Sequence, residues 1–407
     1  MSILLMTASA ALMMISAQTA ALDGAISPEV RALHERVLTL DTHVDIGRNY
    51  ATYVLDPGQM TSAQVDLPKM RAGGLDAAFF IIYTGQGPLD ADGLAQARAH
   101  AEASYQAIDR MIRSYPDQIA LARTADEIEA IHATGRKVAL IGIENPYPLG
   151  LSVDDVPMWA ARGVRYISMT HFGNNQFGGS SNPNLAAGDE PEDPGLTDLG
   201  RELVRALNDY GIMVDVSHGG PLTMRQAAEL SRAPIIASHS GVKAVLDHPR
   251  NLSDEQLEII RDVNGVAQMV ALRSYVKANH PELASAQEAV LAEMGLETRE
   301  ARAAITDQQR FALTTRMEAL HAQYGSATIS DFVDHIDHAV QVAGIDHVGI
   351  ASDFDGGGGI GGWMNAAETP AVTAELVRRG YSEVDIAKIW GGNLMRVLRE
   401  VEVAARD

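Results

Sequence analysis

Cysteine is absent from all 407 residues of the sequence. Disulfide bonds, thiolate zinc sites, cysteine nucleophiles and the lipid anchor of bacterial lipoproteins are therefore excluded, since each of them needs a thiol. Any metal site in this chain must take its ligands from histidine, aspartate and glutamate.

Basic residues are also scarce, with 32 lysines and arginines against 53 aspartates and glutamates. The resulting net charge of -21 argues against nucleic acid or an anionic membrane as a partner, because both are recognised through basic patches. Hydrophobic residues make up 46% and charged residues 21% of the chain, which is typical of a folded protein with a substantial core.

Charge is missing altogether from residues 3–21, which are apolar or small. This stretch and the small residues at 16–21 predict a secretory signal peptide over residues 1–21, and hence a periplasmic or secreted protein. No lysine or arginine precedes the run, so a short membrane anchor, a mis-assigned start or a cytoplasmic protein with a non-functional leader are the alternatives. We expect no stable membrane span after cleavage, because no other stretch is apolar enough to cross a bilayer.

Hydrophobic segments alternate with helical patterns along the rest of the chain. Eight segments have the pattern of strands: residues 37–40, 75–83, 137–144, 164–171, 212–218, 233–239, 265–270 and 347–353. Such alternation predicts a parallel sheet, and eight units predict a closed (β/α)8 TIM-like barrel, here as one domain over residues 27–405. Residues 277–330 are rich in Ala, Glu, Arg and Gln without a strand pattern, which predicts a helical insertion after strand seven.

The strand ends carry an unusual set of side chains. Ionisable groups at buried strand ends are costly unless they are paired, so several of them together indicate a site. All strand ends of a parallel barrel lie on one face, where barrel enzymes place their chemistry. Six of the eight strands end on groups that can bind metals or move protons: His43 with Asp45, Glu144, His171, His218, His239 and Asp353.

These side chains are sufficient for a two-metal site. His43 and Asp45 are two residues apart, so in an extended strand they point to the same side. Three histidines with Asp45 and Glu144 can hold two divalent ions, with the glutamate between them, and two such ions can hold a bridging hydroxide and polarise a carbonyl. Asp353 could then carry protons, while His171 could be either a ligand or a donor to an oxyanion.

The sequence resembles the membrane (renal) dipeptidase family, peptidase family M19 of the amidohydrolase superfamily. The resemblance spans about residues 33–400, in the order that the family has. The segments that carry it are Asp41-Thr42-His43-Val44-Asp45, Ile143-Glu144, Thr170-His171, Asp215-Val216-Ser217-His218, Ser238-His239-Ser240, Arg250-Asn251 and Ser352-Asp353-Phe354-Asp355-Gly356.

The resemblance implies a zinc-dependent dipeptidase with two zinc ions per chain, other divalent metals being possible. It assigns His43 and Asp45 to one ion, His218 and His239 to the other, and Glu144 to both as the bridge. It also implies small dipeptide substrates and allows a homodimer, which cannot be linked by disulfides here because cysteine is absent.

The resemblance gives roles to three further residues. His171 becomes a hydrogen-bond donor to the substrate carbonyl, Asp353 the catalytic acid and base, and Arg250 the clamp on the free C-terminal carboxylate, which suits guanidinium geometry. The chain departs from the family where Asn145-Pro146 follows the glutamate in place of an expected glycine, which leaves the side-chain preference open.

Two other readings of the same residues stay open. One is a related amidohydrolase that acts on N-acyl amino acids, lactams or lactones, for which Arg250 would matter little. The other is a metal-bound binding protein without activity, which the occupied catalytic positions disfavour.

Several ionisable residues outside this set have simpler explanations. His335 and His338 lie three residues apart on an expected helix, which favours a solvated outer face over a second metal site. His34 and His100 are expected at the surface as well. Asp355 could support Asp353 or a metal-bound histidine.

Overall fold

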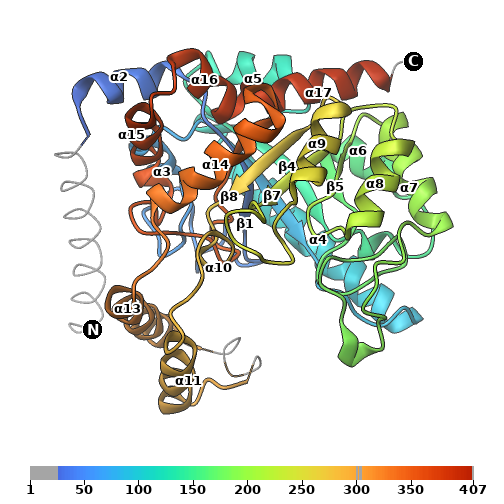
Figure 1. Ribbon diagram of the computed structural model, residues 1–407, viewed down its shortest axis with the longest axis horizontal. Helices are drawn as coiled ribbons and strands as arrows, with labels where there is room; N and C mark the ends of the chain where they lie inside the picture. The colour runs from blue at the N-terminus through green and yellow to red at the C-terminus, as the bar shows by residue number, and fades with distance from the viewer. Residues whose placement is uncertain (1–25, 299–300, 302–304, 406–407) are drawn as a thin grey trace.

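The computed structural model describes residues 26–298, 301 and 305–405, and the predicted signal peptide at residues 1–21 lies outside them. A parallel sheet surrounded by helices forms the body of the molecule (Figure 1). Its eight main strands follow one another in the order β1-β2-β4-β5-β6-β7-β8-β9, and all their pairings are parallel. The predicted α/β barrel is therefore confirmed.

The strands and helices alternate through the described chain. The strands are β1 (Leu40–Asp45), β2 (Ala77–Tyr83), β3 (Ile119–Leu121), β4 (Lys137–Glu144), β5 (Val164–Ser168), β6 (Met213–Asp215), β7 (Ile236–Ser240), β8 (Val266–Val270) and β9 (Val348–Ala351). The helices before β8 are α2 (Pro28–Arg36), α3 (Leu67–Ala72), α4 (Ala91–Ser114), α5 (Ala125–His132), α6 (Val156–Arg162), α7 (Asp198–Asp209), α8 (Pro221–Leu230) and α9 (Asp254–Asp262). Those after it are α10 (Arg273–Val276), α11 (Leu283–Met294), α13 (Asp307–Tyr324), α14 (Ile329–Ala343), α15 (Pro370–Arg379), α16 (Glu383–Ala387) and α17 (Asn393–Ala404).

The first and last strands close the barrel through backbone hydrogen bonds. The amide of Asp353 donates to the carbonyl oxygen of His43 at 3.0 Å, and the amide of Asp45 donates to the carbonyl oxygen of Phe354 at 2.9 Å. These bonds also show why β1 extends to Asp45, five residues beyond the predicted end of the first strand. The pairing partners of residues 41–45 lie in distant parts of the chain, so the local pattern does not reveal them.

The strand β3 was not predicted. It has only three residues and pairs with β4 alone, beside the path of the barrel. A strand this short carries too little periodicity to be distinguished from a loop.

The interior of the barrel is filled by side chains. Residues from several strands, such as Phe79, Leu140 and Met213, belong to one buried cluster that also includes Val397 and Leu398 of α17. The helix α17 covers the N-terminal ends of the strands (Figure 1), where Asn393 donates to the carbonyl oxygen of Val348 at 2.8 Å. This closed end leaves the opposite, C-terminal face for the site.

The segment predicted as a helical insert, residues 277–330, carries α11 and α13. The two helices pack against each other, and Figure 1 shows them extending beyond the body of the barrel. The preceding α10 brings Tyr275 to the C-terminal face of the barrel, so the chain between β8 and α14 also builds part of the site wall.

Two histidines expected at the surface are buried. His335 is 1% exposed, and its ring accepts a hydrogen bond from the amide of Val242 and donates one to the carbonyl oxygen of Val276. His34 is 1% exposed as well, and its ring contacts the Thr373 hydroxyl at 2.7 Å. Both predictions were wrong, because local polarity does not show that the ring nitrogens find tertiary partners.

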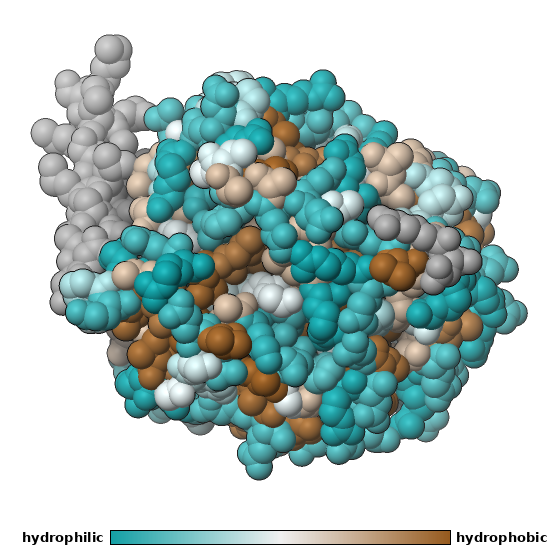
Figure 2. Space-filling model, turned by 90° about the horizontal axis from the view of Figure 1, so that it is seen from above, coloured by the Kyte–Doolittle hydropathy of each residue, from teal (hydrophilic) through white to brown (hydrophobic). Residues whose placement is uncertain are grey.

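The surface seen from above is mainly hydrophilic, with hydrophobic residues in small separate patches (Figure 2). Among the described residues, no helix combines the length and the apolar character that crossing a bilayer requires.

Candidate metal centre and cavity

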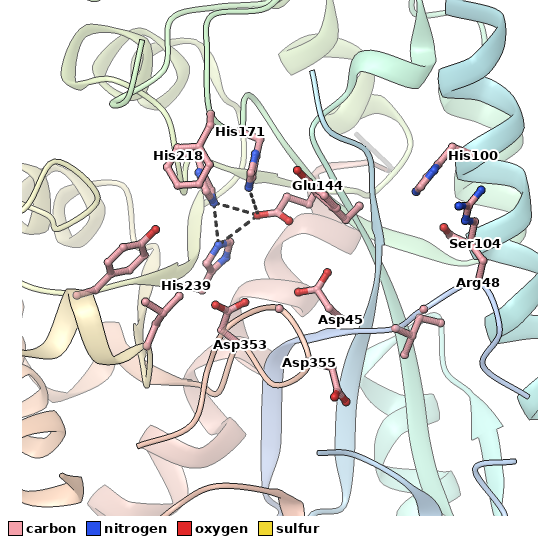
Figure 3. A pocket seen from close by; sticks show the side chains of 17 residues that line it. Asp45, Arg48, His100, Ser104, Glu144, His171, His218, His239, Asp353 and Asp355 are labelled. Carbon is pink, nitrogen blue, oxygen red and sulfur yellow. Dashed lines mark hydrogen bonds and ion pairs between the residues drawn. The ribbon is translucent and has the colours of Figure 1, made fainter. Parts of the chain in front are cut away.

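A cavity of about 570 Å³ opens where the barrel strands end, within the size range of small-molecule sites. The side chains around it come from the C-terminal ends of the barrel strands and from the segments that follow them (Figure 3). Six of the predicted site residues line it: Asp45, Glu144, His171, His218, His239 and Asp353.

His43 is held in one orientation by a tyrosine in the barrel interior. The hydroxyl of Tyr166 donates to the carbonyl oxygen of Thr42 at 3.1 Å, so its oxygen accepts from Nδ1 of His43 at 2.9 Å. A proton of the imidazole is thereby assigned to Nδ1, and Nε2, which has no hydrogen-bond partner, faces the site, where it can hold a proton or a metal ion. Gly142 on β4 makes room for this tyrosine, because a Cβ there would collide with the ring of Tyr166.

His239 is oriented in the same way by a serine. The hydroxyl of Ser238 donates to Asp215 at 2.7 Å and accepts from Nδ1 of His239 at 2.9 Å. Asp215 also accepts from the backbone amides of Ser217 and Ser238, which fixes the turn before His218. The Nε2 lone pair of His239 therefore faces the site as well.

Glu144 lies between the two sets of histidines. Its Oε1 is 3.0 Å from Nε2 of His218 and 3.3 Å from Nε2 of His239, while its Oε2 is 3.7 Å from Nε2 of His43. Nε2 of His43 is also 3.4 Å from Oδ2 of Asp45. The two carboxylate oxygens of Glu144 thus face different partners, which is the arrangement that a bridging ligand needs.

These residues fit divalent metal ions. The Nε2 atoms of His218 and His239 lie 3.0 Å apart, close to the ~3.3 Å that separates two nitrogens bound tetrahedrally to one zinc ion. Ligand atoms also come together in three overlapping groups, each within 4.8 Å: His43 with Glu144 and His239, Glu144 with His171 and His218, and His43 with Asp45 and Asp353.

The electrostatics of the site favour added positive charge. Burial lowers the pKa of His43, but Glu144 and Asp45 outweigh it and raise that pKa to about 10. Burial raises the pKa values of Glu144 and Asp353 above the ordinary range, because each carboxylate is desolvated beside others. Burial also holds the pKa of His239 well below its usual value, so this imidazole stays neutral and can act as a ligand.

Asp353 and His171 flank this group of ligands. Oδ1 of Asp353 lies 3.9 Å from Nε2 of His43, and Nε2 of His171 lies 3.9 Å from Oε1 of Glu144. Burial, followed by the charge of Arg250, lowers the pKa of His171 to about 3, which makes its ring neutral at physiological pH.

Arg250 lies next to the site but does not line the cavity. It is 2% exposed, donates to the carbonyl oxygen of His239 at 3.1 Å, and places its guanidinium 5.5 Å from the ring centre of Tyr275, which does line the cavity. Its Nε has no hydrogen-bond partner, and within the described chain no acidic side chain forms an ion pair with it. A buried cation without a carboxylate partner is costly unless an anion binds to it.

Asp355 has a different role from the one expected. Its carboxylate accepts hydrogen bonds from the amides of Gln64 and Val65 rather than supporting Asp353 or a histidine. Gln64 in turn accepts from the amide of Asp355 at 2.7 Å. These bonds join the loop after β1 to the loop after β9 at the cavity wall.

Several residues at the site have a left-handed backbone conformation. Asn145, His218, Asp353 and Asp355 all have φ between 57° and 68°. Such conformations cost free energy in residues other than glycine and concentrate at functional sites, where the surrounding structure enforces them.

Asn145, which replaces the expected glycine, meets this backbone requirement. Asparagine tolerates a positive φ better than most residues. Its side chain also donates to the carbonyl oxygen of Thr84 at 2.9 Å and accepts from Asn175 at 2.9 Å. The departure from the family pattern therefore keeps the turn after Glu144 and links it to two neighbouring loops.

Changing Asn145 to alanine should lower the free energy of unfolding more than changing it to glycine. Both changes remove buried hydrogen bonds, at about 1 kcal/mol each, but alanine adds about 1 kcal/mol for the left-handed backbone. Urea unfolding of both variants measures the difference. As a control, Asn264 near a helix end has φ 58°, so Asn264→Ala should also be less stable than Asn264→Gly. Equal stability of Asn145→Ala and Asn145→Gly would contradict the explanation.

Sequence reasoning missed the residues that orient the ligands. Tyr166 and Ser238 lie on barrel strands where their hydroxyls face inward, and nothing in the local pattern separates them from ordinary strand residues. His100 was expected at the surface, but it lines the cavity together with Arg48 and Ser104.

The sequence matches a known protein family. The model of the membrane dipeptidases (peptidase family M19) matches residues 28–407. The dipeptidase aclJ of Aspergillus oryzae is 30% identical over 349 residues, which cover 84% of this chain and 71% of the fungal protein. The dipeptidase tcpJ of Claviceps purpurea is 29% identical over 355 residues, covering 86% and 72% of the two chains.

Solved structures of similar fold include proteins named as peptidases. The crystal structure of the probable dipeptidase PvdM from Pseudomonas aeruginosa superposes with a TM-score of 0.81 at 33% identity, covering 93% of this chain and 98% of that one. A metallopeptidase from Rhodobacter sphaeroides, liganded with a phosphinate mimic of the dipeptide L-Ala-D-Ala, shares the fold with a TM-score of 0.68 at 24% identity, covering 90% and 99%.

Proposed function

Because the chain belongs to the membrane dipeptidase family, peptidase family M19, we propose that it is a binuclear zinc dipeptidase. Membership of this family supports the assignment as a metal-dependent hydrolase. The presence of two zinc ions and the identity of the substrates are what we propose. The observation that carries it is the placement of Glu144, whose Oε1 faces His218 and His239 while its Oε2 faces His43.

The ligands divide into two sets around this glutamate. His43 and Asp45 would hold one ion, His218 and His239 the other, and Glu144 would contact both. When bound, the ions would supply an activated water and a Lewis acid for the peptide carbonyl.

The other side chains would position the substrate and move its protons. The neutral ring of His171 would donate a hydrogen bond to the carbonyl oxygen, where negative charge develops. The carboxylate of Asp353 would accept a proton and return it to the departing amine, a role that its burial and raised pKa support. Arg250 would bind the free C-terminal carboxylate of the dipeptide.

Metal analysis combined with a dipeptide panel tests this function. We expect two metal ions per chain, hydrolysis of dipeptides, and much slower hydrolysis when the C-terminal carboxylate is amidated. Changing Arg250 to alanine should lower kcat/KM for dipeptides by at least tenfold, since a charge-assisted hydrogen bond contributes about 1.5–3 kcal/mol. Equal rates on amidated and free dipeptides, with little effect of Arg250→Ala, would favour an amidohydrolase for lactams, lactones or other amides.

The proposal also covers the localisation of the protein and its oligomeric state. We propose export to the periplasm or the medium through residues 1–21, on the sequence pattern alone. A homodimer is proposed from the family resemblance alone.

A further inference from the structure

The cavity extends past the metal ligands to a wall of different character. Figure 3 shows Arg48, His100 and Ser104 together on the side away from His239 and Asp353. Most charged groups around the rest of the cavity are carboxylates, so a guanidinium here is an exception in a protein of net charge -21.

The structure fixes this wall in place. Arg110 of α4 donates to the carbonyl oxygens of Arg48 and Tyr50, both at 3.1 Å, which ties the loop after β1 to that helix. His100 and Ser104 lie four residues apart on the same α4 and therefore on one face of it. The three side chains thus belong to one joined unit.

The polar groups of this wall are available to a ligand. Arg48 is an exposed residue of the loop after β1 that lines the cavity, and within the described chain no carboxylate forms an ion pair with it. Ser104 is only 3% exposed and also lines the cavity, so its hydroxyl can donate to a bound group. His100 is half-buried and also lines the cavity.

The position of the wall determines which part of a substrate reaches it. Arg250 bonds to the backbone of His239, so a C-terminal carboxylate would lie at that end of the cavity. The scissile carbonyl would lie near Glu144, in the middle. The N-terminal residue of a dipeptide would then extend past Asp45 toward the side of the cavity where Figure 3 shows Arg48.

We propose that Arg48, with His100 and Ser104, forms an anion-binding subsite that selects dipeptides whose N-terminal residue carries a carboxylate side chain, an aspartyl or glutamyl residue. The inference rests on the proposed dipeptidase function and names its substrate class. A guanidinium beside a hydroxyl matches a carboxylate in charge and in hydrogen-bond donors.

The test compares isosteric substrates on the metal-loaded protein. Glu-Ala and Gln-Ala differ only in the side-chain charge, and each is used with L- and with D-alanine. We expect kcat/KM for the Glu dipeptide to exceed that for the Gln dipeptide by about tenfold or more, which corresponds to one charge-assisted hydrogen bond. In Arg48→Gln this ratio should fall close to one, and in Arg48→Lys part of it should remain.

Controls separate the subsite from general effects. Arg98 is exposed on the same helix outside the cavity, so Arg98→Gln should keep the wild-type ratio. The metal content of Arg48→Gln should match that of the wild type. A ratio near one in the wild-type protein, or an unchanged ratio in Arg48→Gln, would overturn the subsite while leaving the dipeptidase intact. Failure to hydrolyse any dipeptide would overturn the proposed function and the subsite with it.

Discussion

Asp353→Asn should lower kcat by about two to four orders of magnitude while both metal ions stay bound. General acid and base groups contribute rate factors of this size, and the amide of asparagine cannot take up and release the proton. The backbone amide of residue 353 would still donate to His43, so the barrel should remain closed. Steady-state kinetics and metal analysis of the same preparation measure both quantities.

Asp355→Asn provides the matched control for this result. Asp355 also lines the cavity and has a positive φ, but its carboxylate binds the backbone of the loop after β1. We expect its effect on kcat to be much smaller than that of Asp353→Asn. Loss of metal in Asp353→Asn, or a kcat close to the wild-type value, would show that Asp353 is not the proton carrier.

His43→Ala should remove one of the two metal ions and lower kcat/KM by about a thousandfold or more. Metal ions stabilise charge in the transition state by several kcal/mol, and each 1.36 kcal/mol is a factor of ten in rate. The fold should survive, because the hydrogen bonds of residue 43 within the barrel seam come from its backbone. Mass spectrometry for metals, activity and circular dichroism together test this.

His338→Ala is the corresponding control on an outer helix. His338 of α14 pairs with Asp254 at 2.7 Å, away from the cavity, so its loss should leave metal content and activity unchanged. A His43→Ala variant that still holds two metal ions would contradict the assignment of His43 as a ligand.

Much of this site could be predicted because strand ends converge in a parallel barrel. His43, Glu144, His218 and His239 are far apart in sequence, yet the strand pattern alone predicted that they share one face. The prediction succeeded because a barrel strand is a continuous hydrophobic run, and a polar residue at its end stands out.

The residues that surround the ligands could not be predicted in this way. Tyr166 contacts His43 across 123 positions of sequence, and Arg48 and His100 line the same cavity from a loop and a helix that Arg110 joins. Such contacts depend on the register between strands and on loop paths, which local composition does not encode. The burial of His335 could not be predicted for the same reason, since its hydrogen-bond partners Val242 and Val276 come from other elements.

The seam between β1 and β9 has a consequence for the order of folding. The backbone bonds that close the barrel are made by His43, Asp45, Asp353 and Phe354, so the same short segments complete both the seam and the site. These segments come from opposite ends of the domain, and pairing such distant segments is slow and late. A nascent chain therefore carries ligands without a working centre until its last strand docks. An ion bound there would stabilise the pairing of β1 with β9, and hydrolytic activity would show that the whole barrel has formed.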